Sequence, residues 1–551
     1  MEFSAFSFAT QIAILLVALA AVHRPLGAYL AMAADDDGRH LRAERWLYRV
    51  AGVGPDSSQT WKAYARGVIA LSVAGVLLLY VAQRVQPLLS GGQVHGVDPW
   101  VAMNTAISFV TNTNWQAYTP ETTLGFVIQM AFLAVQNFVS AAVGIAVAFA
   151  LVRGLVRRGT DSLGNLWVDV TRVAFRVLLP LSAIAALVLI VAGVIQDFSP
   201  TTVTNSLTGV SQTIPGGPVA SQEAIKLLGT NGGGYFNANS AHPFENPNAF
   251  TNLFEVFLLL LVPSALPFTF GRMVGDAKQG YTVLTVMGAL WALSTGFMAW
   301  ALAAWPGRGL GLGEGLEQRF GPAASGIFAT ATTLTSTGAV DAAHDSLPPL
   351  AGGMAMANMM LGEIAPGGVG SGLYGMLVLA ILAVFLGGLM VGRTPEYLGK
   401  KVQARHMTLA ALYLLVTPVL VLVLAGAAVL VPAAVAQAPA QGPHQFSELL
   451  YAFTSAANNN GSAFAGITTS DPVLSTLLGI AMWMGRVLPI VLVLALAGSF
   501  AAQEPIPPSK GTLPTYGPLF AGLLGTVALL FTALNYFPAL ALGPIAEGTL
   551  R

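Results

Sequence analysis

Four clusters of glycine, asparagine, threonine and serine stand out in a chain that is otherwise apolar. They read TNTN (111–114), GTNGGG (229–234), TSTG (335–338) and NNNG (458–461). Gly and Asn tolerate the positive φ angles that point successive backbone carbonyls the same way. Rings of such carbonyls can replace the water shell of a dehydrated monovalent cation. No Asp or Glu lies within a cluster, which disfavours Ca²⁺ and Mg²⁺. The clusters therefore predict a binding path for a monovalent cation.

Each cluster follows a short, moderately apolar segment. We predict that each segment is a helix that enters the membrane partway, because non-helical backbone at membrane depth must be buried in protein or line a watery cavity. The C-terminal end of such a helix carries roughly −0.5 charge and would attract a cation. With their clusters, the segments are VAMNTAISFVTNTNWQ (101–116), SQEAIKLLGTNGGGYF (221–236), GIFATATTLTSTGAV (326–340) and ELLYAFTSAANNNGSAF (448–464).

Long apolar stretches flank these segments. The chain has 55% hydrophobic and only 9% charged residues, whereas roughly 25% of residues are charged in soluble domains. Hydropathy predicts an all-α integral membrane protein with ten transmembrane helices, each about 20 residues or longer. The predicted spans are 7–32, 66–88, 121–150, 173–196, 251–271, 281–303, 372–391, 407–433, 473–499 and 514–536.

The clusters also define an internal repeat. Aligned on them, Asn114, Gly232, Gly338 and Gly461 correspond, at intervals of 118, 106 and 123 residues. This spacing predicts four pseudo-symmetric repeats of span, pore helix, filter loop and span, with one extra helix at each end. The predicted units are residues 1–63 (extra span and cytoplasmic loop), 64–165, 166–280, 281–406 and 407–512 (pore repeats 1 to 4), and 513–551 (extra span).

Lys and Arg residues predict the orientation of these spans. Eighteen of them lie in the gaps that follow spans 1, 3, 5, 7 and 9, and five lie on the opposite side. Because cytoplasmic loops carry the excess of positive charge, these gaps are expected in the cytoplasm. Both termini are then expected on the outer side of the membrane.

Several functions have no support in the sequence. The chain has no cysteine for thiol chemistry, no two histidines at the helical spacing of metal ligands, and a net charge of zero that indicates no nucleic-acid partner. GLGLGEG (309–315) and GGVGSG (367–372) lack the Gly-Lys-Ser/Thr of a phosphate-binding loop, so we interpret both as flexible outer connections. We predict no catalytic residue, no bound nucleotide and no ATP hydrolysis by this chain.

Polar residues within the predicted spans leave alternatives open. Arg24 and Arg486 are candidates either for an ion path or for structural pairing. Gln129, Gln136 and Asn137 either face a wet vestibule or form interhelical hydrogen bonds.

Arg393 follows a glycine-rich end of the seventh span. In VFLGGLMVGRTPEYLGKK (384–401) we expect Gly387, Gly388 and Gly392 to interrupt the helix before Pro395. An interrupted helix could place the Arg393 cation across the exit below the filter. The alternative is a cytoplasmic anchor that follows the distribution of basic residues.

Five motifs resemble one family of membrane proteins over essentially the whole chain. They are TNTNWQAYTPE, LGTNGGGYFNANSAHPFENP, GEIAPGGVGSGLYG, GRTPEYLGKK and NNNGSAFAG. They look like the potassium-binding subunits (the KdpA family) of the bacterial Kdp potassium-transporting ATPases. That family belongs to a superfamily of potassium transporters with four pore-loop repeats in one chain.

The resemblance implies specific residues and partners. Carried over residue by residue, it implies a K⁺ filter close to Gln116 that consists of Asn112, Thr113, Asn114, Thr230, Asn231, Gly232, Ser336, Thr337, Gly338, Asn459, Asn460 and Gly461. Family members often have Cys where Thr337 stands, and ligation by the backbone is expected to survive that change. The expected partners in the bacterial inner membrane are the P-type ATPase subunit KdpB, the single-span subunit KdpC and the small peptide KdpF. The resemblance also implies an intramembrane tunnel that starts at a broken helix of the third repeat, here around 384–401.

Two other functions stay open at this point. A self-sufficient potassium channel or cation symporter of the same superfamily would have the same filter but usually only eight core spans. A membrane scaffold would have the same four Gly/Asn-rich loops, but these loops would bind no ion. Stabilisation of the purified chain by K⁺ would distinguish the scaffold from the other two, and co-purification with an ATPase would distinguish the channel from the pump subunit.

Overall fold

The computed structural model describes residues 3–35, 40–92, 94–205, 207–304, 315–316, 318–390, 392, 394–507 and 512–549. Within this part, ten helical stretches are long and apolar enough to cross a membrane, which confirms the predicted number of spans. They are α1 (Ala5–Ala33), α3 (Trp61–Leu89), η1 with α6 (Ile128–Leu133, Ala134–Val156), α7 with η2 and α8 (Leu166–Arg172, Val173–Leu178, Leu179–Val191), α10 (Ala249–Met273), α11 (Ala277–Ala304), α14 (Ser371–Met390), α15 (Ala404–Val429), α18 (Pro472–Ala501) and α19 with η5 and α20 (Pro518–Leu540, Ala541–Ile545, Ala546–Thr549).

Four of the shorter helices between the long ones end at the clusters, one helix at each cluster. The longest has 16 residues and extends about 24 Å, which is less than the roughly 30 Å of a bilayer core. We call them the pore helices: α4 (Pro99–Val110), α9 (Val219–Leu228), α12 (Gly321–Leu334) and α17 (Pro443–Asn458). The structure therefore has the predicted order of span, short helix, cluster and span four times.

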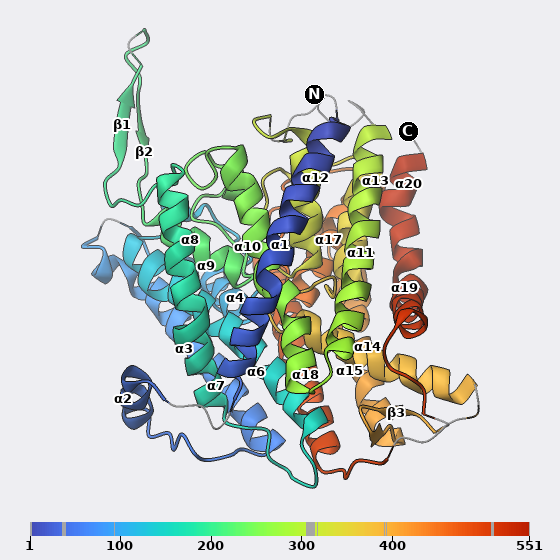
Figure 1. Cartoon of the computed structure of the whole chain (residues 1–551). Helices are drawn as coiled ribbons and strands as arrows, with labels where there is room; N and C mark the ends of the chain where they lie inside the picture. The colour runs from blue at the N-terminus through green and yellow to red at the C-terminus, as the bar shows by residue number, and fades with distance from the viewer. Residues whose placement is uncertain are drawn as a thin grey trace.

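The remaining elements are short. Two antiparallel hairpins pair β1 with β2 and β3 with β4. Figure 1 shows the β1–β2 hairpin projecting from the end of the molecule at which both chain termini lie. These elements are α2 (Arg42–Val50), α5 (Pro120–Thr123), β1 (Thr201–Thr204), β2 (Ser211–Ile214), η3 (Asn239–Ala241), η4 (His344–Ser346), α13 (Pro349–Met360), β3 (Glu396–Tyr397), β4 (Lys400–Lys401) and α16 (Pro432–Val435).

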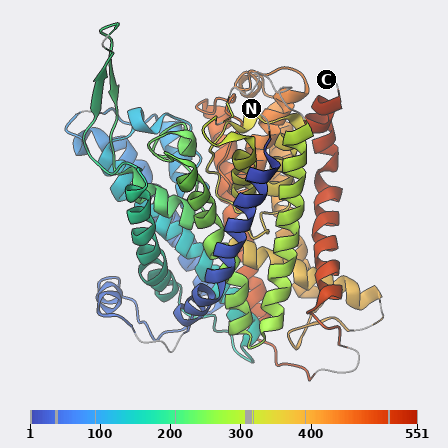
Figure 2. The same cartoon turned by 45° about the horizontal axis from the view of Figure 1, so that its top comes forward.

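Burial separates central from peripheral spans. In the most apolar part of η1–α6, 89% of the residues are buried, whereas only 6% are buried in α1. The α1 helix packs mainly on α10 at the side of the bundle (Figures 1 and 2). An apolar helix that buries so little of itself within the protein presents most of its surface to lipid. This position agrees with α1 as an addition to the repeats.

The third repeat departs from the prediction. We expected its helix to be interrupted at Gly387, Gly388 and Gly392. The α14 helix continues through Gly387 and Gly388 up to Met390, so the predicted break at these two glycines is wrong, whereas Gly392 lies beyond the helix end with a φ of +65°. The interruption lies earlier, in residues 361–370 between α13 and α14. Residues 363–370 are all buried, so interpreting GGVGSG (367–372) as a flexible outer connection is also wrong. Of GLGLGEG, residues 309–314 lie outside the described residues.

Candidate functional site

All four pore helices end with the same local structure. We call residues 112–114, 230–232, 336–338 and 459–461 the candidate filter segments. In each segment, the backbone N–H of the second residue donates to the carbonyl five residues earlier, and the first residue has a left-handed backbone. This is the Schellman arrangement, which satisfies carbonyls that would otherwise lack partners at a helix end. The bonds are Thr113 to Ser108 (2.9 Å), Asn231 to Lys226 (2.8 Å), Thr337 to Thr332 (3.2 Å) and Asn460 to Ser455 (2.9 Å).

Positive φ angles recur at the first and third residues of every filter segment. The first residues are Asn112 (62°), Thr230 (45°), Ser336 (53°) and Asn459 (61°), and the third are Asn114 (54°), Gly232 (69°), Gly338 (76°) and Gly461 (99°). Three of the third residues are Gly, which adopts this conformation without strain. Thr230 is the unusual member, because a β-branched side chain strongly disfavours positive φ. Its Oγ1 accepts a hydrogen bond from the Val369 N–H at 3.0 Å, which helps to hold it.

The four segments meet in a closed ring. A Cβ placed on Gly232 would lie 1.7 Å from the Thr337 carbonyl oxygen of the third segment. In the same way, a Cβ on Gly338 would lie 2.2 Å from the Asn460 oxygen, and one on Gly461 would lie 1.8 Å from the Thr113 oxygen. The first and second segments meet at Gly233, whose Cβ would be 3.2 Å from the Asn114 oxygen. Neighbouring repeats thus touch backbone to backbone in the order 1–2–3–4.

Asn114 occupies the position where the other three segments have Gly, and its side chain braces the ring. Its Nδ2 donates to the Gly232 carbonyl at 3.1 Å and to the Asn137 Oδ1 on α6 at 2.8 Å. Within the described residues, Asn137 thus bonds from α6 to the filter loop, and not to another helix. Gln129 also bonds across elements, through a 3.4 Å contact of its Nε2 with the Tyr235 carbonyl.

Gln116 connects the C-terminal ends of the first two filter segments. Its Oε1 accepts a hydrogen bond from the Gly234 N–H at 2.8 Å, and its Nε2 donates to the Tyr118 hydroxyl at 3.2 Å. The structure therefore places Gln116 beside the ring.

A buried ion-pair network holds the long stretch GTNGGGYFNANSAHPFENP behind the second segment. Lys226, 1% exposed, lies 2.8 Å from carboxylate oxygens of both Glu223 and Glu245 and donates to Asn239 at 2.8 Å. Glu245 also accepts the Phe236 N–H at 2.6 Å. Buried charges persist where they are paired and hydrogen-bonded. The sequence analysis counted Lys226 only as one of the five basic residues on the outer side. It did not predict the ion pairs, because Glu245 lies 19 residues away in the chain.

Glu363 is a site residue that the sequence analysis missed. It lies in the 361–370 interruption and is 1% exposed. Its carboxylate accepts hydrogen bonds from the Ser336 hydroxyl and, at 2.7 Å, from the Asn460 Nδ2. No acid lies within the clusters themselves, but this one supports two of them from below. The sequence did contain a signal for this residue: Glu363 is an acidic residue between two apolar stretches, which makes it a candidate for a functional role.

A cavity of about 80 Å³ adjoins the filter at Ser336 and Asn459, which are the first residues of their segments. It has room for several waters.

The arginines that the sequence singled out differ in their surroundings. Arg486 lines this cavity and lies 3.4 Å from the Ser140 carbonyl, whereas Arg24 is exposed and bonds to the Tyr281 hydroxyl at 2.7 Å. The structure thus pairs Arg24 structurally and places Arg486 next to the filter. Arg393 lies outside the described residues.

Comparison with known proteins gives consistent matches. The family model KdpA, described as the potassium-transporting ATPase A subunit, matches residues 13–549. The potassium-transporting ATPase potassium-binding subunit of Mycobacterium avium (strain 104) is 58% identical over 546 residues, which cover 98% of each chain. That of Streptomyces coelicolor is 56% identical over 543 residues, again with 98% of each chain covered. Among solved structures, the potassium transporter TrkH from Vibrio parahaemolyticus matches with a TM-score of 0.54 and 13% identity, covering 87% of this chain and 98% of that chain.

Proposed function

Because this chain belongs to the KdpA family of potassium-transporting ATPase A subunits, we propose that its ring of four filter segments selects K⁺ on the outer side of the membrane and passes it to an ATPase partner. The observation that carries this proposal is the repeated backbone conformation: the first and third residues of all four filter segments have positive φ angles. The four segments also contact one another in a ring. Alternation of φ along a short strand aims successive carbonyls to one side, where they can replace the water shell of the ion.

The electrostatics of the ring suit a monovalent cation. Four pore helices end there, each with roughly −0.5 charge at its C-terminal carbonyls. The carboxylate of Glu363 hydrogen-bonds to two filter residues, Ser336 and Asn460. Because the four filter segments themselves contain no Asp or Glu, the ring offers neutral oxygens, which divalent ions bind less well than they bind acids.

The interruption at 361–370 supports a sideways exit for the ion. Its Val369 N–H bonds to Thr230, and its Gly367 N–H bonds to the Leu334 carbonyl at 3.1 Å, so this loop packs on the same end of the ring as the cavity. Arg486 in that cavity opposes a cation by about 4 kcal/mol at 4 Å and an effective dielectric near 20. We propose that the 361–370 loop and the positive charge of Arg486 together oppose the passage of K⁺ straight into the cytoplasm and favour its lateral delivery to the ATPase partner. Arg393 remains a second candidate for this gating role.

The partner in this proposal is an ATPase subunit of the KdpB type, accompanied by KdpC and KdpF. The relatives are named as subunits of a potassium-transporting ATPase, which supports an assembly of this kind. Both termini lie at the same end of the molecule (Figure 1), as ten spans require. From the distribution of basic residues, we propose that this end is the periplasmic one.

Transport by the purified complex tests the function. The complex is reconstituted into sealed vesicles, and uptake of K⁺ and Na⁺ is followed with and without ATP on the side of the ATPase domain. We expect ATP-dependent K⁺ movement that Na⁺ does not replace. Equal movement of K⁺ without ATP would instead indicate a self-sufficient channel or symporter.

Gly461→Ala is expected to weaken the apparent K⁺ affinity at least about tenfold, or about 1.4 kcal/mol. The added Cβ would lie 1.8 Å from the Thr113 carbonyl oxygen, so the ring has to deform. Gly442→Ala is the matched control, because Gly442 also has a positive φ (64°) but meets nothing within 4 Å. The K⁺ dependence of ATP hydrolysis by the complex measures both. Similar affinities in the two variants would remove Gly461 from the ring.

A further inference from the structure

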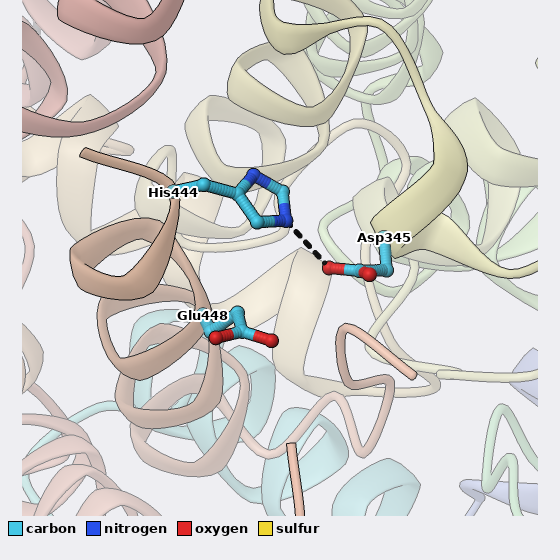
Figure 3. Close-up of side chains that lie close together, drawn as sticks. All are labelled: Asp345, His444 and Glu448. Atoms are coloured by element: carbon cyan, nitrogen blue, oxygen red, sulfur yellow. Dashed lines mark hydrogen bonds and ion pairs between the residues drawn. The ribbon is translucent and has the colours of Figure 1, made fainter. Parts of the chain in front are cut away.

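A histidine and two carboxylates form a compact cluster apart from the filter. Asp345 lies in η4 of the third repeat, and His444 and Glu448 lie on the first turns of the fourth pore helix α17. One ligand atom from each lies within 4.8 Å of the other two. Figure 3 shows the His444 ring directed at Asp345, with the Glu448 carboxylate on the same side. The Nε2 of His444 is 2.9 Å from Asp345 Oδ1.

A second contact fixes the orientation of the His444 ring. Its Nδ1 lies 2.9 Å from Glu547 Oε2 on the C-terminal helix α20. The ring also stacks on Phe464, with centroids 5.8 Å apart and planes at 10°. A histidine whose Nδ1–H donates to a carboxylate presents its Nε2 as a ligand, and this arrangement is typical of metal sites in proteins. The Nε2 is therefore held toward Asp345 and Glu448.

Negative charge exceeds positive charge in this cluster. Glu448 is 1% exposed, and within the described part of the chain its carboxylate accepts one hydrogen bond, from the Ala440 N–H at 3.2 Å. Burial raises the pKa of Glu448 to about 7, and the nearby Asp345 charge adds to this increase. Burial lowers the pKa of His444, but the hydrogen bonds with Asp345 and Glu547 outweigh it and raise the pKa to about 10. A proton on His444 therefore balances part of the charge and competes with any cation.

We propose that Asp345, His444 and Glu448 bind a divalent transition-metal ion of the Zn²⁺ class, with Glu547 holding the Nδ1–H of His444. One imidazole nitrogen and two carboxylate oxygens form a ligand set that Zn²⁺ accepts, and water would complete the tetrahedron. Ligand atoms in such a tetrahedron lie about 3.4 Å apart, so the donors need only small movements. The Asp345 side chain is 27% exposed, which gives the ion a route from solvent.

The ion would join three parts of the chain that are distant in sequence: the outer loop of the third repeat, the start of the fourth pore helix and the C-terminal helix. The cluster also connects to the fourth filter segment. His444 stacks on Phe464, and the ring centroids of Phe464 and Tyr451 lie 4.3 Å apart. The Tyr451 hydroxyl in turn forms a 2.8 Å hydrogen bond with the Ser462 hydroxyl. Ser462 directly follows Gly461 of the ring. The site thus braces the outer mouth of the filter without being part of it.

Metal binding to the purified complex tests this site. After removal of metals with a chelator, the complex is dialysed against Zn²⁺, and bound metal is quantified by elemental analysis. We expect one Zn²⁺ per chain, and X-ray absorption at the zinc edge should show histidine nitrogen and carboxylate oxygen at about 2.0–2.2 Å. His444→Gln and Glu448→Gln should each weaken the affinity at least about tenfold.

Two further variants separate binding from folding. In Gly466→Ala, the new Cβ would lie 2.5 Å from Glu448 Oε1 and 3.3 Å from Asp345 Oδ2, so it obstructs the site while every donor remains. His95→Gln removes an exposed histidine elsewhere and should bind Zn²⁺ like the unmodified complex. If the complex with His444→Gln does not assemble, zinc binding by the Gly466→Ala complex tests the site instead. Zinc that binds equally to Gly466→Ala, or a zinc spectrum without histidine, would overturn the proposal.

Discussion

Gly232→Asp is expected to weaken the apparent K⁺ affinity of the complex at least about 100-fold, or about 2.7 kcal/mol. Gly232 has a φ of +69°, and its Cβ would lie 1.7 Å from the Thr337 carbonyl oxygen. An aspartate at this position therefore strains its own backbone, displaces the third segment and adds a fixed charge beside the ion. We also expect weaker discrimination against Rb⁺ and Na⁺, because a deformed ring no longer holds its oxygens at the spacing that suits K⁺. Titration of ATP hydrolysis with each ion measures both effects.

Gly209→Asp is the matched control for this variant. Gly209 has nearly the same φ (+67°) but lies in the turn of the exposed β1–β2 hairpin, with nothing within 4 Å of its Cβ position. It should keep the ion affinity of the unmodified complex, and size-exclusion chromatography should show that both variants assemble. An unchanged K⁺ affinity in an assembled Gly232→Asp complex would remove Gly232 from the filter.

The second large effect concerns the chain without its partner. In cells that lack every other potassium uptake system, this chain alone should not support growth at very low external K⁺, whereas the chain with its ATPase partner should. A gradient of about 10⁵ opposes entry by about 7 kcal/mol. A membrane potential of about 100 mV supplies only about 2.3 kcal/mol per charge. The difference requires an energy source, and no phosphate-binding loop was found in the sequence.

Growth curves over a range of external K⁺ measure this difference. At high external K⁺ both strains should grow, which controls for toxicity of the expressed chain. Rescue at low K⁺ by the chain alone, at the same expression level, would contradict the pump-subunit proposal and favour the self-sufficient transporter.

The spans and pore helices could be predicted because their signals are local. A long apolar run must cross the bilayer, and a shorter run that ends in Gly and Asn cannot. The position of Asn114 among three glycines also followed from the alignment of clusters, and its φ of 54° agrees with that alignment. These features depend on residue type and chain length alone.

Features that depend on distant partners could not be predicted. Glu363 supports Asn460 from 97 residues away, and the Asp345–His444 contact spans 99 residues. The predicted break at Gly387 failed because glycine tolerates helix where neighbours cover it, here Leu513 and Leu523. Glycine content alone therefore did not distinguish a packed helix from the true interruption at 361–370, in which residues 363–370 are buried beneath the filter.

The most direct test of the filter is to locate the ion. Crystals of the complex in which Tl⁺ replaces K⁺ give an anomalous difference map in which the heavy ion is identified by its own anomalous scattering. We expect peaks inside the ring, within about 3 Å of backbone oxygens from all four segments, namely 112–114, 230–232, 336–338 and 459–461. In the Gly232→Asp complex these peaks should weaken or disappear. A transport-competent complex saturated with Tl⁺ that shows no peak within the ring would contradict the account.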